Sequence, residues 1–328
     1  MKHSMDKRDW VAVDGGFGYF KITYYNEEGK LSFMKELSVL AQADPNHKSD
    51  KLVEHSGSRY WMGMSALLQP SERIIDIKDY SSLKKHHSIL MHNALKKAGK
   101  IERARAGTLN IVIGLSAAHS DDQTAFIKDN QSYVMDGERF THNSILFQEQ
   151  GRGATKALQV ALKQSKGAYS SFLVVDGGFN TLDVAQVIID PEDGTYSTAS
   201  LGAHEGKGFV MVAEQMRSFI SNEYKNAISL KEATQIIENG KYVLRGVPHD
   251  LASTIRKMKT AYSKGLTAFL EKKYGEYFDK SPVVFFVGGV SYFIDEKAES
   301  NFKVVNQAEY YNSLGYLLQA LSDVGITS

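Results

Sequence analysis

The 328-residue sequence contains no cysteine, which excludes disulfides, cysteine-ligated zinc or iron–sulfur sites and thiol nucleophiles. Only five prolines occur, and no proline-rich or serine-rich linker separates the two halves. The apolar runs, such as 283–287, are far shorter than the roughly 18 residues that cross a membrane. Basic residues exceed acidic ones by only 39 to 38, so no bulk charge favours nucleic acid or anionic lipid. We therefore expect a cytoplasmic protein without membrane or direct nucleic-acid contact.

A seven-residue segment occurs twice. Val11-Ala-Val-Asp-Gly-Gly-Phe17 recurs as Leu173-Val-Val-Asp-Gly-Gly-Phe179, half a chain length later. At roughly 150 residues per domain the chain has room for about two domains, and each half contains one copy near its start. The repeat predicts two related domains.

Each copy predicts a β-hairpin. An apolar strand ends at Asp-Gly-Gly, and a second β-like run follows at 20–25 or 182–189. Turn clusters at 26–30 and 190–194 then lead into a third strand in each half. Alternation of strands with helices indicates an α/β protein. Further strands are expected at 110–115 and 283–287, and helices at 154–163, 209–224, 229–238, 251–274 and 308–321.

The Asp-Gly-Gly turns are suited to phosphate. Backbone N–H groups of such a turn point outward, and glycine lets an anion approach them closely. The aspartate can hold a hydrated Mg²⁺, and Lys21 adds a positive charge. One Asp-Gly-Gly sequence is typical of many ordinary hairpins, but two copies at half-chain spacing favour a nucleotide held between two domains.

Other candidate motifs are incomplete. The segment 202–208 lacks the spacing and the Ser or Thr of a P-loop. His86, His87 and His92 have no carboxylate at metal-ligand spacing, so we expect them on a solvent-exposed helix. The segment 84–105 carries seven Lys or Arg residues against one Glu, which predicts a solvated helix face or contact with an acidic partner.

The chain resembles the actin-like ATPases over nearly its whole length, and ParM-like bacterial and archaeal members most closely. The segments 14–21 and 176–183 look like the two phosphate motifs of that family, with Asn180 where a glycine is usual. Val283-Val-Phe-Phe-Val-Gly-Gly289 resembles the adenosine motif, and 310–316 resembles the segment that returns the chain to the first domain. The segments 60–66 and 113–116 are similar to shorter landmarks of the first domain.

The resemblance implies two related ribonuclease-H-like domains of the actin, sugar-kinase and heat-shock ATPase fold, with a nucleotide cleft between them. Domain I would comprise 1–152 plus 309–328, and domain II 153–308. It also implies Mg-dependent ATP hydrolysis coupled to a head-to-tail cytoskeletal filament, with GTP left open as the nucleotide. Members of this type commonly segregate plasmid DNA through an adaptor protein.

The same resemblance assigns the site residues. Glu149 matches the position of the residue that orients the hydrolytic water, and it is flanked by Gln148 and Gln150, so the match can shift by one. Asp176 is the second catalytic candidate, and Asp14 and Asp176 are the candidates for contacting Mg²⁺ through water. The nucleotide-binding candidates are Asp14, Gly15, Gly16, Phe17, Gly18, Lys21, Gly177, Gly178, Phe179, Asn180, Thr181, Gly202, Gly288 and Gly289.

Two alternatives remain open. A small-molecule kinase of the same superfamily would carry similar phosphate hairpins, although kinases of this length often have a cysteine-ligated zinc site, which this sequence cannot form. A member that binds nucleotide without hydrolysing it is the other alternative. Polymerisation on addition of MgATP would separate the filament-forming ATPase from both.

Overall fold

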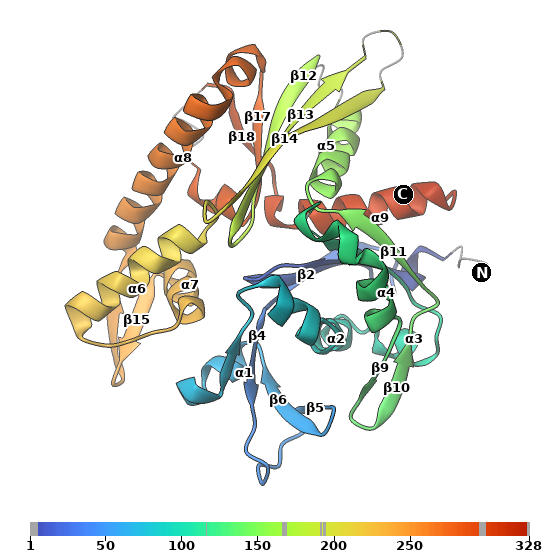
Figure 1. Ribbon diagram of the computed structural model, residues 1–328, viewed down its shortest axis with the longest axis vertical. Coiled ribbons are helices and arrows are strands. Elements are labelled where there is room, and N and C mark those ends of the chain that lie inside the picture. Colours follow the sequence, from blue (N-terminus) through green and yellow to red (C-terminus); the bar gives the residue numbers. More distant parts are fainter. Residues whose placement is uncertain are drawn as a thin grey trace. The chain divides into compact units, whose positions relative to one another are not determined.

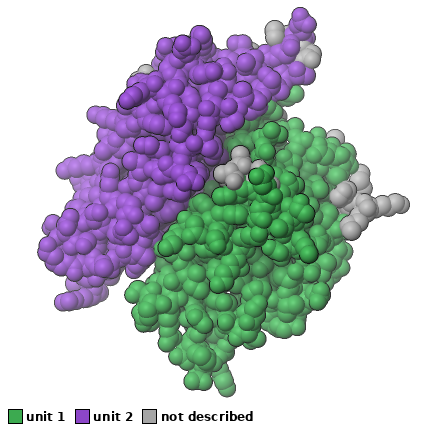
Figure 2. Space-filling view, in the orientation of Figure 1, with its two compact units in different colours: residues 1–164, 310–328 green, residues 165–309 purple. Residues whose placement is uncertain are grey.

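A computed structural model describes residues 6–115, 117–165, 169–190, 192, 195–294 and 300–326. The chain divides into two compact units, residues 1–164 with 310–328 (unit 1) and 165–309 (unit 2), coloured separately in Figure 2. The domain boundaries expected from the sequence stay a prediction. Ser116 and most of the expected turn at 190–194 lie outside the described residues.

Unit 1 is built on a five-stranded sheet of order β11-β8-β1-β2-β3 (Figure 1). Strands β1 (Trp10–Gly15), β2 (Tyr19–Tyr25) and β3 (Leu31–Leu37) form the expected antiparallel meander. Strands β8 (Asn110–Leu115) and β11 (Ser144–Glu149) continue the sheet in parallel with β1. The carboxyl ends of three parallel strands therefore meet at the edge where β1 turns into β2.

Helices cover both faces of this sheet, and the alternation of side chains along β1 shows which face is which. Val11 and Val13 pack with the residues of α2 (Tyr80–Lys97) and α4 (Gln123–Gln131). Trp10 and Ala12 pack instead with α9 (Tyr311–Asp323), on the other side (Figure 1). The remaining elements of unit 1 are β4 (Val39–Gln42), β5 (Val53–His55), β6 (Ser58–Met62), α1 (Met64–Leu67), β7 (Ile74–Asp76), α3 (Ile101–Arg105), β9 (Ser132–Met135), β10 (Glu138–Thr141) and α5 (Arg152–Ser165).

Unit 2 repeats the plan of unit 1. Its sheet has the order β14-β13-β12-β17-β18, in which β12 (Ser171–Gly177), β13 (Thr181–Ile189) and β14 (Tyr196–Glu205) form the meander. Strands β17 (Val284–Gly288) and β18 (Phe302–Val304) run parallel to β12. The same strand order in both units confirms the predicted α/β class and the duplication. The other elements are α6 (Val210–Tyr224), α7 (Leu230–Asn239), β15 (Lys241–Leu244), β16 (Val247–Asp250) and α8 (Ala252–Lys280).

Two helices of unit 2 illustrate what local sequence determines. Helix α7 begins where its capping box predicts, because Ser229 Oγ accepts from the Glu232 N–H and Glu232 Oε2 accepts from the Ser229 N–H. Helix α8 extends beyond the predicted end at 274, with non-helical backbone angles at Tyr274. None of the described helices is both long and apolar enough to span a membrane.

The prediction of solvent-exposed histidines was wrong. His86, His87 and His92 are buried in α2, where the helix packs on the sheet. His87 Nδ1 lies 2.8 Å from Asn130 Oδ1, while both ring nitrogens of the buried His142 lack a hydrogen-bond partner among the described residues. Burial lowers the pKa of His87, His92 and His142 to about 4 in each case.

These histidines predict acid sensitivity of unit 1. Each has a lower pKa when folded than when unfolded, so the unfolded chain binds more protons between about pH 6.5 and 4. Stability is therefore complete above pH 6.5, and each of these histidines should lower the free energy of unfolding by about 2–3 kcal/mol between pH 7 and pH 4.5. Urea unfolding followed by circular dichroism measures this. His142→Phe should reduce the pH slope and the exposed His47→Phe should not; equal slopes in both variants would contradict the account.

The basic segment 84–105 is not simply a solvated helix face. Lys84 lies 2.7 Å from Asp122, and the fully buried Lys100 lies 2.8 Å from Glu27. Lys97 pairs with Glu36, Arg103 with Asp9 and Glu27, and Arg105 with Glu102 and Glu138. The acidic partners thus belong to unit 1 itself, and these charges stabilise its fold.

Candidate functional site

The first hairpin holds Asp14 at the carboxyl end of β1. The side chain is only 3% exposed, so its charge requires partners. Lys21 Nζ, on the paired residue of β2, lies 3.3 Å from Asp14 Oδ2, and Gln150 Nε2 donates to Asp14 Oδ1 at 3.0 Å. The structure therefore joins Asp14 and Lys21 as the sequence predicts, and it adds Gln150.

The glycine turn after Asp14 is closely packed. The Gly16 N–H donates to Tyr19 O at 3.1 Å, and a Cβ at Gly16 would lie 2.8 Å from that oxygen. Ser38 Oγ donates to Gly16 O at 2.6 Å, and the Ser38 N–H donates to Gly18 O at 3.1 Å. Phe17 packs against the core on the α2 side. Because Ser38 donates to two of the turn's carbonyl oxygens, these hydrogen bonds fix the conformation of the turn.

The second hairpin places Asp176 at the equivalent end of β12, 6% exposed. Its cross-strand partner is Asp183, at the position where the first hairpin has Lys21. Burial, together with the nearby Asp176, raises the pKa of Asp183 to about 7. The duplicated hairpins therefore differ electrostatically: one pairs a carboxylate with an ammonium group, and the other pairs two carboxyl groups.

The turn of the second hairpin is fixed by the start of α6. Gly178 O accepts from the Phe209 N–H at 3.1 Å, and Phe179 O accepts from the Val210 N–H at 2.7 Å. Thr181 O accepts from the Gly178 N–H at 2.9 Å, which closes the turn. Asn180 does not adopt a positive φ, so its replacement of the usual glycine introduces no backbone strain.

Lys231 is a buried cation beside this turn that sequence reasoning missed. The side chain lies on the first turn of α7, is 1% exposed, and places Nζ 4.6 Å from the ring centre of Phe179. The only sequence signal for it is an early lysine in a capped amphipathic helix, which ordinarily predicts an exposed side chain.

The late glycine pair contacts the second hairpin. Gly288, with φ +74°, ends β17, and a Cβ there would lie 2.6 Å from Asp176 Oδ1 and 2.5 Å from Gly177 O. A Cβ at the neighbouring Gly289 would lie 3.7 Å from Gly177 O. Gly202, in contrast, lies on β14 against Tyr274 of α8, so the structure does not bring it to the turn.

The segment that joins β11 to α5 contains the predicted water-orienting residue. Glu149 Oε2 lies 2.8 Å from Arg152 Nε, and the Glu149 side chain of this ion pair is partly exposed. Asn312 of α9 accepts the N–H groups of Gly151 and Ala154 through Oδ1, at 3.1 Å each, and so caps the start of α5. The role of Glu149 stays a prediction, and Gln150 is the residue of this segment that touches Asp14.

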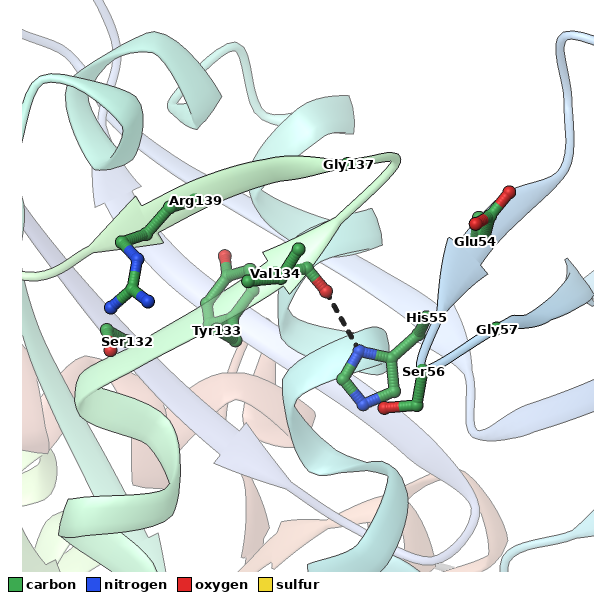
Figure 3. A pocket seen from close by; sticks show the side chains of 9 residues that line it. All are labelled: Glu54, His55, Ser56, Gly57, Ser132, Tyr133, Val134, Gly137 and Arg139. Atoms are coloured by element: carbon green, nitrogen blue, oxygen red, sulfur yellow. Dashed lines mark hydrogen bonds between the residues drawn. The ribbon is translucent and has the colours of Figure 1, made fainter.

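A cavity of about 430 Å³ lies elsewhere in unit 1, between the β5–β6 and β9–β10 hairpins (Figure 3). His55 donates from Nδ1 to Val134 O at 3.0 Å across it. None of the predicted phosphate-binding residues lines this cavity, so it is separate from the candidate site. Its lining comprises Glu54, His55, Ser56, Gly57, Ser132, Tyr133, Val134, Gly137 and Arg139.

Searches of family models and of curated proteins found no match to the sequence. Solved structures do match. A ParM from a 15-stranded filament of Clostridium botulinum has a TM-score of 0.75 and 17% identity, with 95% of this chain and 99% of that chain covered. An archaeal actin homologue in complex with ADP has a TM-score of 0.69 and 18% identity, and the match again covers 95% of this chain and 99% of that chain. Bacillus thuringiensis ParM with ATP has a TM-score of 0.60 and 14% identity, with 95% of this chain and 98% of that chain covered. The resemblance found in the sequence thus holds for the structure, and the chain has the two-domain actin fold.

Proposed function

We propose that the chain is a cytoplasmic actin-like ATPase that binds MgATP and polymerises head to tail into filaments. The observation that carries the proposal is the duplicated hairpin, in which a buried aspartate and a glycine turn stand at the carboxyl end of a parallel strand. Ligands of open α/β sheets bind at this end of the strands. Segregation of plasmid DNA through an adaptor is the cellular role that the resemblance to ParM supports.

Phosphate binding is proposed to depend on glycine turns and buried cations. Gly15, Gly16 and Gly18 let phosphate oxygens approach the first turn, and Gly177 and Gly178 do so in the second. Lys21 contributes positive charge to the first, and Lys231 does so beside the second. Gly288 and Gly289, close to Gly177, are proposed to support the nucleoside.

Magnesium fits the second hairpin best. Asp176 and Asp183 are cross-strand partners, and the pKa of Asp183 is raised first by burial and second by the nearby Asp176 carboxylate, so two negative charges here are costly. A hydrated Mg²⁺ held by Asp176 would relieve that cost and would neutralise charge on the phosphates. Asp14, which accepts hydrogen bonds from Lys21 and Gln150, is the second residue that we propose to contact Mg²⁺ through water.

Hydrolysis in such a site needs positioning and charge stabilisation more than covalent chemistry. The transferring phosphoryl group passes through a loose transition state, so fixed donors and cations contribute most of the catalysis. A group that orients the attacking water completes the site. We assign it to the segment between β11 and α5, whose N–H groups are fixed by Asn312.

Sedimentation tests the proposal. MgATP should move the protein from the supernatant into the pellet, whereas MgADP at the same concentration should leave it soluble. A protein that binds neither nucleotide would contradict the proposal, and one that phosphorylates a small molecule without sedimenting would favour the kinase.

A further inference from the structure

The cavity between the β5–β6 and β9–β10 hairpins has walls that hydrogen bonds hold together (Figure 3). The Asp136 N–H donates to Glu54 O at 2.9 Å, and Asp136 Oδ1 accepts from the Glu54 N–H at 2.7 Å. His55 Nδ1 donates to Val134 O at 3.0 Å and adds a third link between the hairpins. The volume of about 430 Å³ lies in the range of small-molecule sites, so a ligand of that class fits between these walls.

Arg139 brings a positive charge to the cavity lining. Its side chain has no ion-pair or hydrogen-bond partner among the residues that the structure describes. The adjacent Glu138 binds Arg105 instead, with Oε2 2.7 Å from Arg105 Nη2. Glu54 points away from the His55 ring (Figure 3), as neighbouring residues of a strand do. The Arg139 guanidinium group can therefore bind an anion from solution.

Ser132 accompanies Arg139 at one end of the cavity. Arg139 pairs across the hairpin with Val134, and Ser132 lies two residues before Val134, so all three belong to one face of the hairpin. The Ser132 hydroxyl has no hydrogen-bond partner in the described part of the chain. A guanidinium group binds a phosphate or carboxylate through parallel N–H groups, and a nearby hydroxyl adds a further donor. This end of the cavity therefore suits an oxyanion.

His55 and Ser56 lie at the opposite end of the lining (Figure 3). Because His55 Nδ1 carries the proton donated to Val134 O, Nε2 of the neutral ring presents a lone pair. Neither Nε2 nor the Ser56 hydroxyl has a hydrogen-bond partner among the described residues. The Val134 side chain is 47% exposed and lies between the two ends (Figure 3). These groups suit ligand hydroxyls carried on a short carbon chain.

We propose that this cavity binds a small molecule with a phosphate or carboxylate at one end and hydroxyl groups at the other, the chemistry of a sugar phosphate or a sugar acid. Arg139 and Ser132 bind the oxyanion, and His55 Nε2 accepts a hydrogen bond from a ligand hydroxyl. Val134 contacts the carbon chain. The cavity residues lie outside the phosphate hairpins, so the inference does not depend on the proposed ATPase function.

Isothermal titration calorimetry on the purified full-length protein tests the proposal, with ribose 5-phosphate, gluconate and inorganic phosphate as probes. Arg139→Gln should weaken binding of the sugar phosphate or sugar acid about 10–100-fold, because it removes charge-assisted hydrogen bonds. Arg256→Gln removes an exposed arginine of α8 and should keep the affinity of the parent. Inorganic phosphate should bind at least about tenfold more weakly, because it cannot reach both ends of the cavity.

A second control separates this cavity from the phosphate hairpins. Lys21→Gln removes the cation beside Asp14 and should leave the affinity for ribose 5-phosphate and gluconate unchanged. Affinity that is lost in Lys21→Gln and kept in Arg139→Gln would overturn the proposal and place the anion at the first hairpin. Absence of saturable binding by both hydroxylated probes would also overturn it. Tighter binding of one of the two would identify the oxyanion as phosphate or carboxylate and support the proposal.

Discussion

Gly315→Ala is expected to destabilise unit 1 by about 3 kcal/mol or more. Helix α9 crosses the start of α5 so closely that a Cβ at Gly315 would lie 1.7 Å from Gly153 O. The reciprocal contact is also close, since a Cβ at Gly153 would lie 2.4 Å from Tyr316 Cε1 and 2.5 Å from Asn312 O. The atoms that a Cβ at Gly315 would meet all belong to the backbone of Gly153, so no side chain can move aside, and the helices must separate and weaken the Asn312 cap.

Equilibrium urea unfolding measures this effect. The matched control is Gly265→Ala, at an exposed position within α8 where a Cβ meets no atom within 4 Å. That control should be stabilised by about 0.5–1 kcal/mol, because alanine favours the helix. Equal stabilities of the two alanine variants would show that the close helix crossing is not present in solution.

Asp176→Ala is expected to reduce ATP hydrolysis roughly 1,000-fold while the fold stays intact. Asp176 is the proposed magnesium contact of the second hairpin, and its removal leaves the phosphates without that charge compensation. Stability should be unchanged or slightly higher, because burial alone then raises the pKa of Asp183 and the smaller contribution of the Asp176 carboxylate is lost. A mutation that merely damaged the core would lower stability instead.

Phosphate release and thermal unfolding, measured on the same preparations, check both parts of this prediction. Asp279→Ala removes an exposed aspartate from α8 in the same unit and serves as the control. Asp14→Ala should behave like Asp176→Ala in turnover but should lower stability, since it removes the buried carboxylate that lies 3.3 Å from the Lys21 ammonium group. Unimpaired phosphate release in Asp176→Ala would remove the second hairpin from the site.

The sequence could predict what depends on local pattern and repetition. The strand at 110–115 and the capping box at Ser229 were found from neighbouring residues alone. The duplicated hairpins appear in both units because each is encoded within a few residues. The burial of His87 and Lys231 was not predictable, since helix polarity says little about a polar side chain that tertiary packing encloses.

Contacts between distant segments were the other limit. Gln150, which follows β11, contacts Asp14 of β1 across the strand β8 that pairs in parallel with both. A shift of one residue along a strand moves a side chain to the opposite face of the sheet. The sequence marked the segment 148–150, but it could not show that Gln150 is the residue of this segment that contacts Asp14. Asn312 capping α5 likewise joins residues that no local pattern connects.

We propose that nucleotide binding drives head-to-tail assembly, and time-resolved light scattering with simultaneous phosphate detection is the decisive experiment. A limited amount of MgATP is added to the purified protein. Scattering should rise first, phosphate release should follow, and scattering should decline once the ATP is consumed. Scattering that stays at the level of the nucleotide-free protein while phosphate is released would contradict it.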